Sequence, residues 1–122
     1  MSTYLMVALG GALGSVARFG LSNLIALRYA GSFPLATLIV NVTGSLAIGY
    51  LAATTTSQSA RNFLMIGVCG GYTTFSAFSL QTLTLIQGGQ WLSAAGNIGL
   101  SVVLCIGGAW LGYVAGLALN PA

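Results

Sequence analysis

The chain has 122 residues, of which 57% are apolar and only three are charged, and it contains no Asp, Glu, Lys or His. A soluble domain carries about 25% charged residues, so this composition indicates an integral membrane protein. Without carboxylates or histidines the chain cannot assemble a general acid–base pair, a Ser-His-Asp triad, or the usual zinc and calcium sites. An enzyme is therefore not expected, and neither is a proton-coupled transporter, which needs an intramembrane acid or histidine relay.

The net charge of +3 comes with no anionic side chain. In a polar cavity this balance favours an anion over a cation, although a bundle surrounded only by lipid could have the same composition. We expect a lipid bilayer, and no nucleic acid, among its partners.

Four apolar segments follow one another at about residues 4–27, 34–55, 61–87 and 91–119. Each reaches the length of about 20 residues that a membrane-spanning helix needs. The connections between them are short and polar, and the first segment lacks the basic start of a cleaved signal peptide. The sequence therefore predicts an all-α protein with one four-helix transmembrane domain over residues 1–122.

Small residues recur four positions apart, which favours close packing of helices within or between subunits. The recurring residues are Gly10 and Gly14, Ser45 and Gly49, Gly67 and Gly71, and Gly108, Gly112 and Gly116. Four helices cannot enclose a wide pore, so we expect a homodimer or a larger assembly. Arg28 and Arg61 fall on opposite sides of the membrane, so the charge bias that sets orientation is close to nil. Two copies could then insert in opposite directions and pair antiparallel.

The third segment contains Gly70-Gly71-Tyr72-Thr73-Thr74, a poor sequence for a continuous helix. Glycine costs about 1 kcal/mol relative to alanine in a helix, and the two threonines are β-branched. Backbone groups freed by a break in lipid must be satisfied by protein, water or an ion. The stretch therefore predicts a bound ion or a polar cavity, and the alternative is a glycine-rich packing face whose hydroxyls bond their own helix carbonyls.

Polar side chains at helical spacing follow the second and fourth segments, and they could line an ion path or hold helices together. They are Thr37, Asn41 and Ser45 in the second segment, and Asn97, Ser101 and Cys105 in the fourth. Asn41 could form an interhelical hydrogen bond or offer its NH₂ group to a passing anion. Cys69 and Cys105 both lie in apolar segments, so we expect buried thiols rather than a disulfide.

One face of the third segment carries Phe75, Phe78, Ser79 and Thr82. Paired aromatic residues are commonly core residues, yet the positive edges of two rings with hydroxyls between them also suit a small anion. Arg18 lies inside the first segment, and it could act as an interfacial anchor or attract anions at a vestibule.

With these residues assembled, the chain resembles the Fluc (CrcB-type) fluoride channel family over essentially its whole length. The most specific similarity is Gly70–Ser79, which resembles the family signature GGxTTFSxFS. The stretches Gly10–Arg18 and Thr37–Asn41 also resemble the family.

The resemblance implies a fluoride-selective passive channel that exports fluoride from the cytoplasm through the cell inner membrane. It also implies an antiparallel, dual-topology homodimer whose third helices break near the bilayer centre. There the carbonyl groups of Gly70 and Thr73 would hold a structural, untransported sodium ion (Na⁺). The implied fluoride pore comprises Asn41, Phe75, Ser76, Phe78, Ser79 and Ser101. Arg18, Gln81 and Thr82 would lie at the vestibule or pore entrance.

This chain departs from the family pattern at three positions. Gln81 stands where a glutamate is usual, which bears on the conduction rate more than on the fold. Asn97 and Cys105 occupy positions where hydroxyl or aromatic polar side chains are more familiar. Two alternatives are a small four-helix exporter, which would need a glutamate in the first segment, and a non-conducting assembly subunit. The second predicts that replacing Phe78 by Ile leaves transport unchanged.

Overall fold

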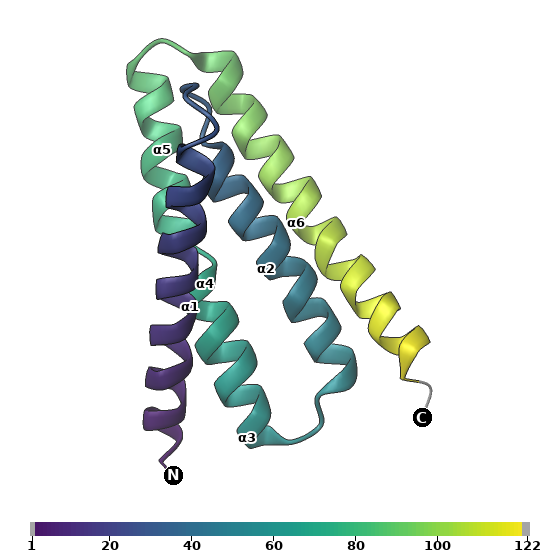
Figure 1. The fold of residues 1–122 in the computed structure, drawn as a ribbon. Coiled ribbons are helices and arrows are strands. Elements are labelled where there is room, and N and C mark those ends of the chain that lie inside the picture. Colours follow the sequence, from purple (N-terminus) through teal and green to yellow (C-terminus); the bar gives the residue numbers. More distant parts are fainter. Residues whose placement is uncertain (1, 121–122) are drawn as a thin grey trace.

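The computed structural model describes residues 2–120, and its regular elements are all helices (Figure 1). Three long helices are continuous: α1 (Thr3–Ala26), α2 (Leu35–Thr54) and α6 (Trp91–Leu119). The third apolar segment is divided into α3 (Gln58–Arg61), the π-helix η1 (Asn62–Cys69), α4 (Gly70–Tyr72) and α5 (Phe75–Gln87). Counted as spans, these elements make four helices long and apolar enough to cross a membrane, as the sequence predicts.

Hydroxyl caps determine where several of these helices begin. The Ser57 hydroxyl accepts a hydrogen bond from the Ala60 N–H, so the third span begins at Gln58 rather than near Arg61. The Ser2 hydroxyl caps α1 in the same way, through the Leu5 N–H. Such caps satisfy backbone donors that the first helical turn leaves without partners.

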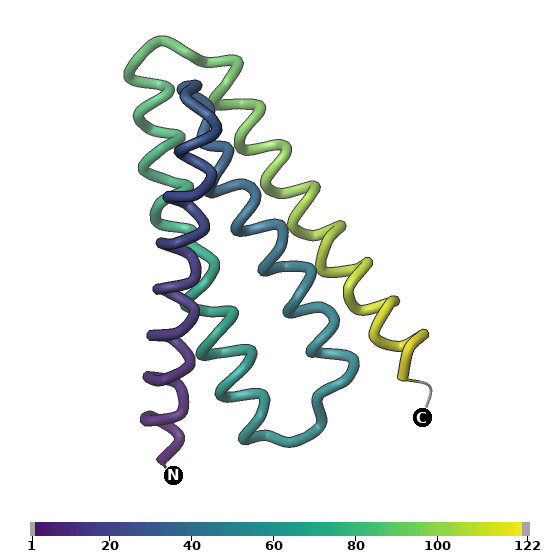
Figure 2. Tube along the Cα trace, in the orientation of Figure 1, coloured from purple at the N-terminus to yellow at the C-terminus, as the bar shows by residue number. Residues whose placement is uncertain are grey.

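The arrangement of the spans brings both termini to one end of the molecule (Figure 2). The connection between α2 and α3 lies at that same end, whereas the α1–α2 and α5–α6 connections lie at the other. Arg61 stabilises the α2–α3 connection by donating to the carbonyl groups of Thr55 and Ala52 at the end of α2. Ser32 and Gln90 join the two connections at the opposite end through a 2.9 Å hydrogen bond.

Glycines allow the closest helix contacts. The helix α1 lies along η1 and α4, and a Cβ added at Gly10 would be 2.9 Å from the Gly67 Cα. The helix α2 lies along α6, where a Cβ at Gly49 would meet the Ala109 carbonyl and one at Gly112 would meet the Leu46 carbonyl. These contacts are between backbones, so a side chain cannot move aside to make room.

The Gly112→Ala substitution should destabilise the protein by about 1–3 kcal/mol, because overpacking forces two backbones apart. Gly99→Ala in the same helix is the matched control, since nothing lies within 4 Å of a Cβ at that position. Thermal unfolding in detergent micelles would compare the two variants. Equal midpoints would contradict the packing described for α2 and α6.

Candidate functional site

The centre of the candidate site is the interruption between α4 and α5. Thr73 and Thr74 are both extended there, with φ/ψ of −85°/157° and −148°/115°. The helix restarts at Phe75 because the Thr74 hydroxyl accepts a 3.1 Å hydrogen bond from the Ala77 N–H. Thr74 thus acts as the N-cap of α5.

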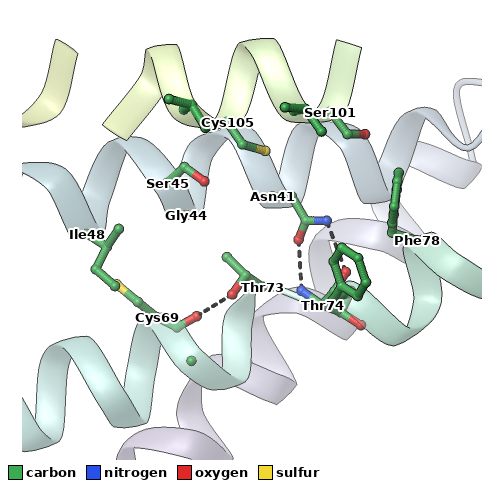
Figure 3. A pocket seen from close by; sticks show the side chains of 14 residues that line it. Asn41, Gly44, Ser45, Ile48, Cys69, Thr73, Thr74, Phe78, Ser101 and Cys105 are labelled. Carbon is green, nitrogen blue, oxygen red and sulfur yellow. Dashed lines mark hydrogen bonds between the residues drawn. The ribbon is translucent and has the colours of Figure 1, made fainter. Parts of the chain in front are cut away.

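Asn41 of α2 holds this extended segment through two reciprocal hydrogen bonds (Figure 3). The Thr74 N–H donates to Asn41 Oδ1 at 2.8 Å, and Asn41 Nδ2 donates to the Thr74 carbonyl at 3.0 Å. The amide therefore pairs with the backbone as a neighbouring strand would. An NH₂ group has two hydrogens, so one donor of Asn41 is left over for another acceptor.

Two hydrogen bonds at the interruption leave the carbonyl groups of Gly70 and Thr73 without their helical donors. In a continuous helix each carbonyl accepts from the N–H four residues later. The Thr74 N–H, which would serve Gly70, donates to Asn41 instead, and the Ala77 N–H, which would serve Thr73, donates to the Thr74 hydroxyl. Two oxygens on one short segment can thereby serve as ligands for a hard cation.

The neighbouring carbonyl of Gly71 is satisfied by α1. It accepts hydrogen bonds from Arg18 Nε at 3.2 Å and from the Ser15 hydroxyl at 3.4 Å. A cation is favoured at this position, because the carbonyl end of a helix carries partial negative charge. Arg18 is therefore directed toward the interruption between α4 and α5.

A cavity of about 360 Å³ lies beside the interruption, between α2, α5 and α6. Its lining includes six residues that the family resemblance assigns to the pore or the ion site: Asn41, Gly70, Thr73, Phe75, Phe78 and Ser101. The Phe75 and Phe78 rings pack with centroids 5.2 Å apart and a tilt of 44°. Phe78 is buried, whereas Phe75 is 78% exposed on the single chain. Figure 3 shows Cys105 and Ser101 of α6 opposite Asn41 and Thr73.

A second, smaller cavity of about 160 Å³ contains both Arg18 and Gln81. Thr74 lines both cavities, so this one lies beside the same interruption. The Gln81 Oε1 atom is buried and has no hydrogen-bond partner within the chain. Because the chain has no acidic residue, the Arg18 guanidinium gives this cavity a positive potential.

Comparison with known proteins shows the family to which this chain belongs. Residues 5–113 match the family model described as CrcB-like protein, Camphor Resistance (CrcB). A protein of Rhodospirillum rubrum is 54% identical, with 97% of each chain covered, and one of Opitutus terrae is 52% identical, with 98% of this chain and 96% of the relative covered. Both are named fluoride-specific ion channel FluC. This chain belongs to the CrcB/FluC family. Its relatives are ion channels rather than enzymes, and with four apolar spans it is a multi-pass membrane protein.

Three further residues implied by the FluC resemblance lie outside both cavities. Ser76 and Ser79 are exposed, with their hydroxyls 3.3 Å from the Thr74 hydroxyl and 3.0 Å from the Phe75 carbonyl, respectively. Thr82 is buried and bonded to the Phe78 carbonyl and to Asn97. The contact of these residues with an ion stays a prediction.

Sequence reasoning did not single out Thr74, although it caps α5, pairs with Asn41 and lines both cavities. A signal for it was present. A threonine directly before an apolar helical stretch is a common N-cap. What the sequence did not contain was the partner for its N–H group, which comes from α2.

The Asn41→Leu substitution should destabilise the fold by about 1–3 kcal/mol, because the Thr74 N–H and carbonyl would both lose their partner away from water. Asn23→Leu, at an exposed position of α1, is the control and should have little effect. Thermal unfolding of both variants in micelles would measure this. An unchanged midpoint for Asn41→Leu would show that the interruption does not depend on the amide.

Proposed function

We propose that this protein is a fluoride-selective passive ion channel that exports fluoride from the cytoplasm across the cell inner membrane. The observation that carries the proposal is the cavity beside the interruption. It combines neutral hydrogen-bond donors with two aromatic rings in a chain that has no acidic side chain. The names of the relatives support fluoride as the ion.

The lining suits a small, strongly hydrated anion. A selective pore must replace the water around its ion without binding the ion too tightly. The remaining N–H of Asn41, the Ser101 hydroxyl and the positive edges of Phe75 and Phe78 are all neutral groups that can face an anion. A formal positive charge at this point would hold the ion more strongly and slow its release.

Arg18 and Gln81 fit the entrance to such a path. The guanidinium of Arg18 would raise the local concentration of anions in the smaller cavity. Gln81 adds no negative charge to oppose it. Because conduction is passive, the direction of flow follows the fluoride gradient, so accumulated cytoplasmic fluoride would leave the cell.

We further propose that two copies form an antiparallel homodimer. The α3 helix, which contains Arg61, lies at the same end of the molecule as the termini. The α1–α2 connection, which contains Arg28, lies at the other end, so neither orientation is favoured. The exposed ring of Phe75, next to the cavity, is a surface that a second copy could cover.

We also propose a structural sodium ion held by the Gly70 and Thr73 carbonyls of both copies. The support is that both oxygens have lost their helical donors. In the proposed dimer the two copies would supply four such oxygens, and a bound cation would offset their mutual repulsion. Thr74, fixed by Asn41, keeps the segment extended and its carbonyl groups available.

Fluoride release from liposomes, followed with a fluoride electrode, tests the channel. The unmodified protein should release fluoride but not chloride. Phe78→Ile should lower the flux by about two- to tenfold, because an aromatic ring interaction of about 0.5–1.5 kcal/mol is lost. Phe33→Ile, in the α1–α2 connection, is the control and should conduct normally. Unchanged flux in Phe78→Ile would favour a non-conducting assembly subunit.

Sodium dependence of stability tests the ion site without requiring transport. The unfolding midpoint in micelles should rise with sodium concentration, because a ligand that binds only the folded state stabilises it. Replacing sodium by N-methyl-D-glucamine should abolish the rise. Asn41→Leu, which releases the segment, should show no rise, whereas Gly99→Ala should respond as the unmodified protein does. A midpoint independent of sodium would exclude the site.

A further inference from the structure

A buried chain of hydrogen bonds joins α5 to α6 directly behind the larger cavity. The Thr82 hydroxyl donates to the Phe78 carbonyl at 2.7 Å, and Asn97 Nδ2 donates to the Thr82 hydroxyl oxygen at 2.9 Å. At the other end, the Ser101 hydroxyl lies 3.4 Å from Asn97 Oδ1. Asn97 is only 1% exposed, so its amide depends entirely on these partners.

The Phe78 carbonyl determines which group is the donor in each of these hydrogen bonds. A carbonyl oxygen can only accept, so the Thr82 hydroxyl must donate its single hydrogen to the Phe78 carbonyl. The Thr82 oxygen then accepts, which orients the NH₂ group of Asn97 toward it. The amide oxygen is left facing Ser101, and the Ser101 hydroxyl must be the donor.

Ser101 differs in this respect from other hydroxyls of the same chain. Six serine and threonine hydroxyls donate to the backbone carbonyl four residues earlier, and these belong to Thr43, Thr54, Thr73, Ser79, Thr82 and Thr84. Their distances lie between 2.7 and 3.0 Å. Ser101 instead donates to the side chain four residues earlier, through a longer bond.

We propose that Asn97 is a positioning residue that draws the Ser101 hydroxyl away from its own helix backbone and keeps it available to an anion in the larger cavity. The bond to Asn97 is long and therefore weak. A passing anion can take the Ser101 hydrogen at a smaller cost than if a short backbone bond held it. Asn97 itself does not contact the ion, because it is only 1% exposed and does not line the larger cavity.

The inference rests on the proposed function, since it concerns how Ser101 serves an anion path. It adds a role for Asn97, one of the positions at which this chain departs from the family pattern. It also explains why an amide can replace a hydroxyl side chain there. An amide has separate donor and acceptor groups, so it can donate to Thr82 and accept from Ser101 at the same time.

A double-mutant cycle of fluoride flux in liposomes tests the proposal. In Asn97→Leu, the Ser101 hydroxyl should turn to the carbonyl of residue 97, the same i−4 bond that six other hydroxyls of the protein form. We expect the flux to fall about three- to tenfold, the factor that one hydrogen bond represents. Ser101→Ala should lower the flux by a similar factor, and the double variant should conduct no less than either single variant. Thr84→Val, which removes a backbone-bonded hydroxyl of α5 outside both cavities, should leave the flux unchanged.

Several outcomes would overturn the proposal. Normal flux in Asn97→Leu would do so, and so would a double variant whose loss is the product of the two single losses, because independent effects multiply. A structure of Asn97→Leu gives a readout that does not depend on flux. The Ser101 oxygen should lie within hydrogen-bond distance of the main-chain oxygen of residue 97, and an unchanged Ser101 rotamer would contradict the inference.

If Asn97→Leu does not fold, Thr82→Val replaces it, since it keeps the volume and removes the group that orients the amide. Flux should again fall, and a double variant with Ser101→Ala should conduct no less than either single variant. Losses that multiply in the double variant would overturn the proposal. If the unmodified protein releases no fluoride, the proposed function itself fails. In that case the Ser101 rotamer in the variant structure still decides whether Asn97 orients the hydroxyl.

Discussion

The two hydrogen bonds between Asn41 and Thr74 are the interaction on which the rest of the site depends. They satisfy an extended backbone segment inside an apolar span, where unpaired peptide groups would be expensive. By occupying the Thr74 N–H they also release the Gly70 carbonyl from its helical role. Capping of α5, orientation of the phenylalanines and the proposed ion ligands all follow from the geometry that this pair maintains. One amide on α2 thus determines the structure of a segment more than thirty positions away in the chain.

The interruption is tolerated because three kinds of group share its backbone. Side-chain amide, hydroxyl and guanidinium groups satisfy the peptide groups of Thr74, Ala77 and Gly71, respectively. The oxygens of Gly70 and Thr73 lack their helical donors and are the ligands of the proposed ion. This division gives the glycines of α1 a functional consequence. Close approach of Gly10 and Gly14 to η1 and α4 is what brings Arg18 within reach of the Gly71 carbonyl.

The hydroxyls of this chain differ in their hydrogen-bond partners. Six of them donate to the backbone carbonyl four residues earlier, which hides a polar group from lipid. The Ser101 hydroxyl donates instead to the Asn97 side chain, and the Thr74 hydroxyl accepts from the first turn of α5; both residues line the larger cavity. A hydroxyl hydrogen that is not bonded to a helix carbonyl is available to an ion in the cavity.

Sequence alone determined that this is a membrane protein with four helical spans, because composition and segment length depend on no tertiary contact. It also identified Gly70–Thr74 as a poor helix and Asn41, Phe78 and Ser101 as candidate site residues, because residue chemistry and spacing are local properties. Only the tertiary structure decided which partners these residues have. It directed Arg18 toward Gly71, left Ser76 and Ser79 outside the cavities and gave Thr74 its central place. Periodicity specifies the face of a helix on which a side chain lies, but the groups opposite that face are set by how helices distant in sequence pack together.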